Sequence, residues 1–263
     1  DLTPCDNPEL DGAPLVPSLP DIASDDANDA ECWAGPDETE LNMCSLGPKD
    51  AERRIVAIGD SHNNAMLTAY EAAADELGSR IDVAGHAGCF WTDEALELEN
   101  EEQTQACAEW RAAVDDFVAE TGDVDAYRVA SRGGTSDADQ ARVDGIVSAW
   151  AKRASTDVPV LALLDNPYFG DSPVPCVSED PATAAERCAV PEETAVLDDG
   201  KARAVEADPN ATLLDLTPAY CADGMCPPVI GGVVVYRDAH HLTATYASTL
   251  GPYLARELRD AIG

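Results

Sequence analysis

The segment RRIVAIGDSHNN, residues 53–64, sets the architecture of this chain. A short apolar, β-branched run leads directly into Gly-Asp-Ser, and apolar residues then recur at helical spacing up to Gly78. This pattern predicts a strand over 54–59, a tight turn and a helix over 64–77. Ser61 would then lie at the carboxyl end of a strand and the amino end of a helix, where backbone N–H groups favour negative charge. An oxyanion formed during attack by a serine needs such donors.

Strand and helix patterns continue to alternate along the rest of the chain. The alternation predicts a three-layer α/β/α sandwich with a central, mostly parallel, five-stranded sheet. In such sheets, functional sites lie beyond the carboxyl ends of the strands. The expected further strands are about 80–85, 126–131, 158–164, 212–216 and a short 233–237, and the expected helices are about 101–120, 136–154, 192–206 and a C-terminal pair divided at Gly251-Pro252.

The first 52 residues have a different character. They are rich in Pro, Asp and Ala and show little periodicity, so we expect residues 1–52 to form an extended, disulfide-pinned linker with a helical turn near 25–31. Residues 53–263 would form the catalytic domain. The chain begins with Asp1 instead of Met, as expected of a piece excised from a longer protein. No run of about 18 apolar residues is present, so we expect no membrane insertion by this fragment.

The charge of the chain is strongly negative. It carries 51 acidic and 16 basic residues, a net charge of −35. Nucleic-acid binding needs a basic surface, so this balance argues against a nucleic-acid partner, and it equally argues against docking on anionic lipid. We interpret the charge as a solubility feature. A calcium-binding surface is the alternative, but the sequence has no D-x-D-x-D-G loop.

Nine cysteines indicate disulfides and an oxidising, extracytoplasmic compartment. The absence of a C-x-x-C pair argues against a zinc ribbon or a thioredoxin-like site. Spacing alone does not determine connectivity. Pairing of sequence neighbours is one possibility, and it leaves Cys5 for a partner upstream or as a free thiol; the pairs would be Cys32–Cys44, Cys89–Cys107, Cys176–Cys188 and Cys221–Cys226.

A serine nucleophile needs a base, and the base needs an orienting carboxylate. Asp238 and His241 stand three residues apart just before the last helical segment, a spacing that can bring a carboxylate against an imidazole. The alternative for Ser61 is a purely structural role as a helix N-cap. His240 and His241 could also bind zinc together with Asp60 or His62. Because adjacent histidines are expected to point to different sides and no third ligand has helical spacing, we predict no metal and no cofactor. His62 is interpreted as a structural or rim residue.

These motifs resemble those of the SGNH (GDSL-like) hydrolase superfamily. Residues 59–62 (GDSH) are similar to its first block and residues 238–242 (DAHHL) to its last. The closer resemblance is to the SGNH domain fused behind integral-membrane acyltransferase-3 (AT3) proteins, and it runs from about residue 53 to the end. The residues that carry it are Leu164-Asp165-Asn166-Pro167 with Pro175-Cys176, Cys221 with Cys226, and residues 235–243, while the Pro-Cys pair at residues 4–5 fits the linker of that branch.

The resemblance implies that Ser61 is the nucleophile, His241 the general base and Asp238 its orienting acid. The motif Asp-x-x-His favours His241 over its neighbour. The Gly-x-Asn-Asp block of the superfamily is absent, with residues 131–134 (SRGG) in its place, and the glycine block is matched only loosely. Besides the Ser61 N–H, the expected oxyanion or substrate residues are therefore Gly88, Arg132 and Asn166.

The implied activity is transfer of an acyl group, acetyl as the expected one, to a hydroxyl of a cell-surface or cell-wall glycan. The donor would be a membrane AT3 domain upstream, in the same chain, which would also tether this extracytoplasmic domain. If water attacks instead of the hydroxyl, the chain is a carbohydrate or acyl esterase. A third hypothesis is a catalytically idle glycan-binding module, motivated by the missing block. The presence of Ser61, Asp238 and His241 argues against it.

Overall fold

The computed structural model describes residues 13–133 and 137–262. Five parallel strands form the centre of the molecule in the order β4-β3-β5-β6-β8. They confirm the predicted parallel five-stranded core, because each apolar run can be buried between layers of helices. These strands are β3 (Arg54–Gly59), β4 (Arg80–His86), β5 (Ala126–Ala130), β6 (Val160–Leu163) and β8 (Ala211–Leu214).

The N-terminal segment adds two short strands to one edge of this sheet. β1 (Trp33–Ala34) pairs in parallel with β4, and β2 (Cys44–Leu46) pairs with it in antiparallel orientation, giving seven strands among the described residues. The predicted turn near 25–31 is replaced by two 3₁₀ helices, η2 (Leu19–Ser24) and η3 (Ala30–Cys32). Strands of two or three residues have too little periodicity to be recognised in a sequence. Division of the chain at residue 52 stays a prediction.

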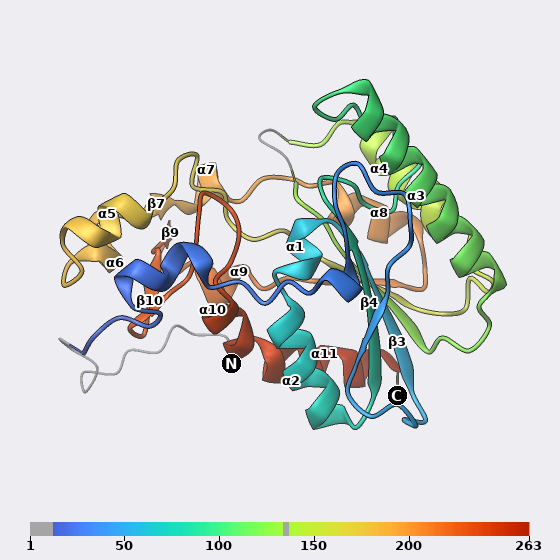
Figure 1. The fold of residues 1–263 in the computed structure, drawn as a ribbon, viewed down its shortest axis with the longest axis horizontal. Coiled ribbons are helices and arrows are strands. Elements are labelled where there is room, and N and C mark those ends of the chain that lie inside the picture. Colours follow the sequence, from blue (N-terminus) through green and yellow to red (C-terminus); the bar gives the residue numbers. More distant parts are fainter. Residues whose placement is uncertain (1–12, 134–136, 263) are drawn as a thin grey trace.

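Helices cover both faces of the sheet, which completes the predicted three layers (Figure 1). On one face, α2 (Leu67–Leu77) packs against α10 (Ala244–Thr249) and α11 (Gly251–Ile262). The break between α10 and α11 falls at the predicted Gly-Pro pair. The other face carries α3 (Glu101–Glu120), α4 (Gln140–Trp150) and α8 (Lys201–Ala207), which bury Trp110 and Trp150 against the strands.

Two predicted helices are interrupted. The helix expected over 64–77 consists of α1 (Ser61–Asn64) and α2, because the N–H of Met66 bonds the carbonyl three residues back and tightens the chain at that point. The helix expected over 192–206 consists of α7 (Glu192–Ala195) and α8, separated by Gly200 at a φ of 83°. The start of the helix expected over 136–154 lies outside the described residues.

A smaller lobe lies beside the sheet, on the left of Figure 1. The strand expected over 233–237 is only the two-residue strand β11 (Val233–Val234) in this lobe. It pairs with β10 (Val229–Ile230) and not with the main sheet. Ile22 and Val177 lie at the centre of a separate apolar cluster in this lobe. Its elements are α5 (Val174–Glu179), α6 (Ala184–Arg187), β7 (Val190–Pro191), β9 (Met225–Cys226), β10 and β11, and α9 (Thr217–Tyr220) connects β8 to it.

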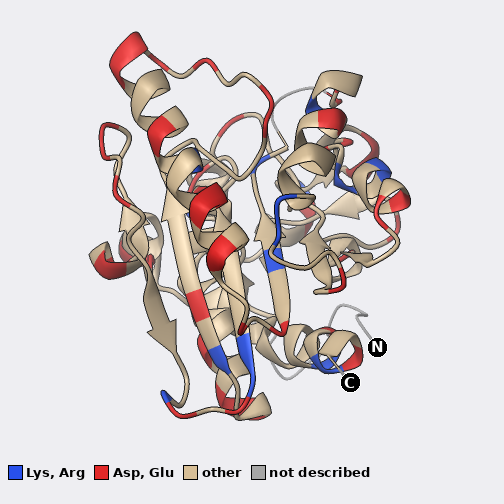
Figure 2. Ribbon diagram, turned by 90° about the vertical axis from the view of Figure 1, so that its right-hand side faces the viewer, with Lys and Arg blue, Asp and Glu red and all other residues tan. Residues whose placement is uncertain are grey.

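Sequence neighbours pair in all four disulfides, Cys32–Cys44, Cys89–Cys107, Cys176–Cys188 and Cys221–Cys226. Cys5 lies outside the described residues. Figure 2 shows Asp and Glu distributed over helices and loops, with few basic residues among them. Within residues 13–133 and 137–262, no helix combines the length and the apolar character needed to cross a bilayer.

Candidate active site

Ser61 stands where the chain leaves β3 and begins α1. Asp60 is the N-cap of α1, and its second carboxylate oxygen accepts the Arg132 N–H at 2.8 Å, which ties the turn to the chain after β5. Gly59 packs so closely on β5 that a Cβ there would lie 1.8 Å from the Ala130 carbonyl oxygen. The turn therefore requires glycine. At the first position of a helix, the Ser61 N–H has no intrahelical acceptor and is available to an oxyanion.

The loop between β11 and α10 brings His241 and Asp238 to this turn. Ser61 Oγ lies 2.8 Å from His241 Nε2, and His241 Nδ1 lies 2.7 Å from Asp238 Oδ2. The other Asp238 oxygen accepts the backbone N–H groups of His240 and His241, at 2.9 and 2.7 Å. The three predicted side chains are thus in one hydrogen-bonded row. Their geometry is that of a nucleophile, a base and an orienting acid.

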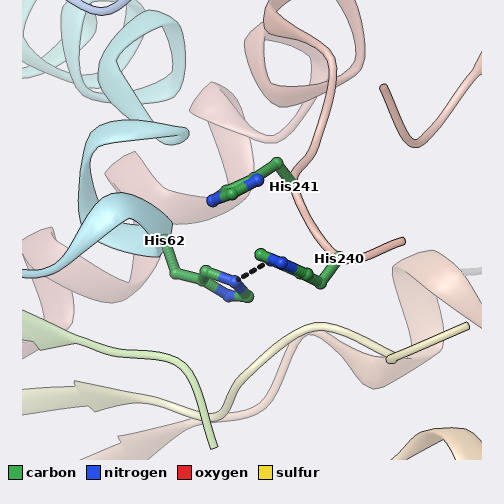
Figure 3. A group of neighbouring side chains, drawn as sticks. All are labelled: His62, His240 and His241. Atoms are coloured by element: carbon green, nitrogen blue, oxygen red, sulfur yellow. Dashed lines mark hydrogen bonds between the residues drawn. The ribbon is translucent and has the colours of Figure 1, made fainter. Parts of the chain in front are cut away.

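A second histidine–carboxylate pair lies beside the first. His62 Nδ1 is 2.6 Å from Asp165 Oδ1, and His62 Nε2 is 2.9 Å from His240 Nδ1. Asp165 lies two residues after the end of β6, and Gly133 N–H donates to its second oxygen at 2.7 Å. His62, His240 and His241 face one another at the carboxyl edge of the sheet (Figure 3). Sequence reasoning interpreted His62 as a structural or rim residue; its side chain is buried and belongs to this group, so it does not lie at the rim.

Burial and hydrogen bonds act against each other at the ionisable groups of the two pairs. Partial burial opposes the charged form of Asp238, but hydrogen bonds from His241 and from two backbone N–H groups hold the pKa of this carboxyl far below its ordinary value. Burial also opposes protonation of His62, and the charge and hydrogen bond of Asp165 outweigh it and raise the pKa of His62. Burial, and then the neighbouring His241, His62 and Arg132 charges, lower the pKa of His240 to about 3, so this ring is neutral. In the hydrogen bond between the two rings, His62 Nε2 therefore donates and His240 Nδ1 accepts.

A family model describing an SGNH domain fused to AT3 domains matches residues 27–256. The chain belongs to this SGNH family. The match includes the residues of both histidine–carboxylate pairs and both edge strands of the N-terminal segment. No curated protein matches the chain.

A solved structure with a TM-score above 0.5 confirms the fold of this SGNH domain. The domain is similar to the periplasmic domain of the lipopolysaccharide acetyltransferase of Salmonella ser. Paratyphi A, with 14% identity, a TM-score of 0.59, and coverage of 88% of this chain and 92% of that chain. It is also similar to a carbohydrate esterase family 2 enzyme with its carbohydrate-binding domain from Corynascus thermopiles (Myceliophthora fergusii), with 14% identity, a TM-score of 0.43, and coverage of 82% and 68%.

The three other predicted site residues have different environments in the SGNH domain. Gly88 has a φ of 67° in the turn after β4, the strand next to β3. The side chain of Arg132 lies over the Tyr168 ring at 5.4 Å, and its charge acts on His62. The Asn166 amide donates to the His240 carbonyl at 2.8 Å, which holds the histidine loop in place. Roles of these residues in substrate binding stay predictions.

Aromatic side chains near the site motifs differ in exposure, and those of Trp91 and Tyr236 are buried. Both are core residues, with 3% and 0% of their surface exposed. The partly exposed Tyr168 ring lies 6.3 Å from the His240 ring instead. Sequence reasoning did not select it. Its position three residues after Asp165 at the end of β6 was the available signal.

Proposed function

We propose that this SGNH domain transfers an acyl group, acetyl as the expected one, through an ester on Ser61 to a hydroxyl of a cell-surface or cell-wall glycan. The observation that carries the proposal is the continuous row of hydrogen bonds from Ser61 Oγ through His241 to Asp238. A helix N-cap would need the serine alone. An idle binding module would need neither the base nor the orienting acid.

The first half-reaction loads the serine. His241 Nε2 takes the Ser61 proton while Oγ attacks the acyl carbonyl carbon, and Asp238 stabilises the imidazolium that forms. The Ser61 N–H donates to the resulting oxyanion. As the tetrahedral intermediate collapses, the bond to the donor's leaving group breaks and His241 returns the proton to that group. The acyl group then remains as an ester on Ser61.

The second half-reaction unloads the serine. The acceptor hydroxyl gives its proton to His241 Nε2 and attacks the acyl carbon, and Ser61 Oγ leaves with the proton from His241. We propose Gly88 N–H and Arg132 as the additional groups that stabilise the oxyanion or hold the substrate. The backbone of Arg132 is fixed beside the Ser61 turn, because its N–H donates to Asp60.

Three features support a membrane-bound donor and a sugar acceptor. The family is described as fused to AT3 domains, which fits an AT3 donor in the same chain. Four disulfides fit an oxidising, extracytoplasmic location, where cell-wall glycans are exposed. The partly exposed Tyr168 ring beside His240 offers an apolar face of the kind that packs on a sugar ring. With water as the acceptor, the same row of residues would make an esterase.

An acylation assay tests the proposal. The domain is incubated with p-nitrophenyl acetate while p-nitrophenol release and intact mass are followed. We expect an acetyl adduct that disappears in Ser61→Ala and persists in Ser248→Ala, an exposed serine on α10. Adding glycan acceptors should then convert hydrolysis into transfer, whereas unchanged hydrolysis would support the esterase. Equal p-nitrophenol release by the wild type and Ser61→Ala would contradict the proposed nucleophile.

A further inference from the structure

Three imidazoles meet at one point of the site. One ring nitrogen from each of His62, His240 and His241 lies within 4.8 Å of the other two (Figure 3). The His62 and His240 rings are stacked with centroids 5.1 Å apart, and the His240 and His241 centroids are 4.1 Å apart. Acyl transfer as derived above uses only His241 directly. The convergence of the other two rings on it is unexplained by that reaction.

The outer contacts of these rings are those of metal ligands. His62 holds Asp165 with its Nδ1, and His241 holds Asp238 with its Nδ1. A carboxylate on the far nitrogen fixes the ring and makes the facing nitrogen more basic, an arrangement that recurs around metal-bound histidines. The third ring, His240, is positioned through its backbone, because its N–H is held by Asp238 and its carbonyl by Asn166.

We propose that His62, His240 and His241 form a binding site for a divalent transition-metal ion, with zinc as the best fit. Tetrahedral zinc with Zn–N bonds of about 2.0–2.1 Å places its nitrogen ligands roughly 3.3 Å apart. His62 Nε2 and His240 Nδ1 are now 2.9 Å apart, so they must separate by about 0.4 Å. The widest of the three separations, bounded by 4.8 Å, must close by up to about 1.5 Å. Both adjustments require the imidazole rings to move on their side-chain bonds.

The donor set selects the class of ion. Three imidazole nitrogens suit zinc, copper or nickel, whereas calcium and magnesium require oxygen ligands. The proton now shared by His62 and His240 leaves when the metal binds. A water molecule or the Ser61 hydroxyl, 2.8 Å from His241 Nε2, can provide the fourth ligand.

Metal binding at this site would inhibit the enzyme, a consequence that rests on the proposed function. The lone pair of His241 Nε2 is the one that takes the Ser61 proton. Once that lone pair is donated to a metal, it cannot accept the proton. The domain is therefore either loaded with metal or competent in acyl transfer, and the concentration of free zinc sets the balance between the two forms.

Direct binding is the first test. The full domain is titrated with zinc by calorimetry and, separately, with Co²⁺, whose visible bands report tetrahedral nitrogen coordination. We expect one ion per chain in the wild type and in Ser61→Ala. His240→Ala should abolish the cobalt bands, and Asp165→Asn should weaken zinc binding by about 10–100-fold through the loss of an outer contact. His86→Gln is the matched control, because it changes the one histidine of the chain outside the group.

The outcomes separate this inference from the proposed function. Equal zinc affinity in the wild type and a folded His240→Ala variant, or cobalt spectra typical of octahedral oxygen ligands, would overturn the site and indicate binding by surface carboxylates. Zinc should also suppress acetylation of Ser61, and a chelator should restore it. Metal binding without any acetylation in metal-free protein would leave the site standing and refute the proposed function. Acetylation that persists in metal-saturated protein would refute the inhibition.

Discussion

Replacing Asp238 by Asn tests how the orienting acid controls the proton on His241. One Asp238 oxygen accepts two backbone N–H groups, and the other accepts from His241 Nδ1. In Asp238→Asn, the amide oxygen must stay on the two backbone donors. The amide NH₂ then faces Nδ1, which has to become an acceptor. The proton of the neutral ring moves to Nε2, where it blocks the transfer from Ser61.

The magnitude follows from these contacts. Flipping the amide would restore the productive tautomer but would leave two backbone N–H groups without acceptors, at about 1–3 kcal/mol each. A total of about 2–6 kcal/mol leaves the productive form in roughly one molecule in 30 to one in 10⁴. Loss of the carboxylate charge removes further stabilisation of the imidazolium. We therefore expect Asp238→Asn to slow acylation of Ser61 by about 10³–10⁴-fold.

The assay is the rate of acetyl-enzyme formation from p-nitrophenyl acetate, measured by intact mass on a sample whose melting temperature matches the wild type. Asp260→Asn is the control, since Asp260 is an exposed carboxylate on α11 away from the site. It should acylate at the wild-type rate. A folded Asp238→Asn variant that acylates within about tenfold of wild type would refute the tautomer argument.

Two further substitutions test the packing and the charge network that support the site. Gly85→Ala would place a Cβ 1.9 Å from Asn64 Oδ1, so it should lower stability by about 1–3 kcal/mol in thermal unfolding. Gly122→Ala is the control, because open space surrounds Gly122, and it should leave the melting temperature unchanged. Equal melting temperatures for the two variants would contradict the packing argument. Asp82 is buried, and although burial opposes its charge, hydrogen bonds from partners that include Arg54 lower its pKa. Because the folded pKa lies below the unfolded value near 4, this carboxylate stabilises the fold above about pH 4, and that contribution is lost as pH falls through the folded pKa. Chemical unfolding should therefore show Asp82→Asn about 1–3 kcal/mol less stable at pH 7, with the difference shrinking below about pH 4, and a pH-independent difference would contradict this role.

Local patterns predicted the central layers because burial on both faces leaves a strong signal. Apolar or alternating segments predicted the parallel strands, and the helix over 101–120 has those bounds in the structure. The row formed by Ser61, His241 and Asp238 was predictable for a different reason. Ser61 and His241 are 180 residues apart, but each belongs to a short motif whose chemistry requires the other. Spacing alone would not have joined them without the family resemblance.

The second histidine–carboxylate pair lacked such a motif. His62 follows β3 and Asp165 follows β6. These two strands lie on either side of β5 in the sheet, so the contact could be predicted only from the strand order. The expectation that His240 and His241 point to different sides was wrong, because it assumes an extended chain. One oxygen of Asp238 holds both backbone N–H groups, which curls the loop and turns both rings toward His62.

The same features that make His241 a base also suit it to a metal. A base for Ser61 needs a neutral ring, a carboxylate on the far nitrogen and a lone pair that faces the reacting group. A zinc ligand needs the same three properties; His62 repeats the carboxylate contact through Asp165, and its Nε2 must release a proton before it can bind a metal. What opposes a cation here is Arg132, whose charge acts on both His62 and His240. The guanidinium proposed to stabilise an oxyanion would thus also weaken binding of a cation at the proposed metal site.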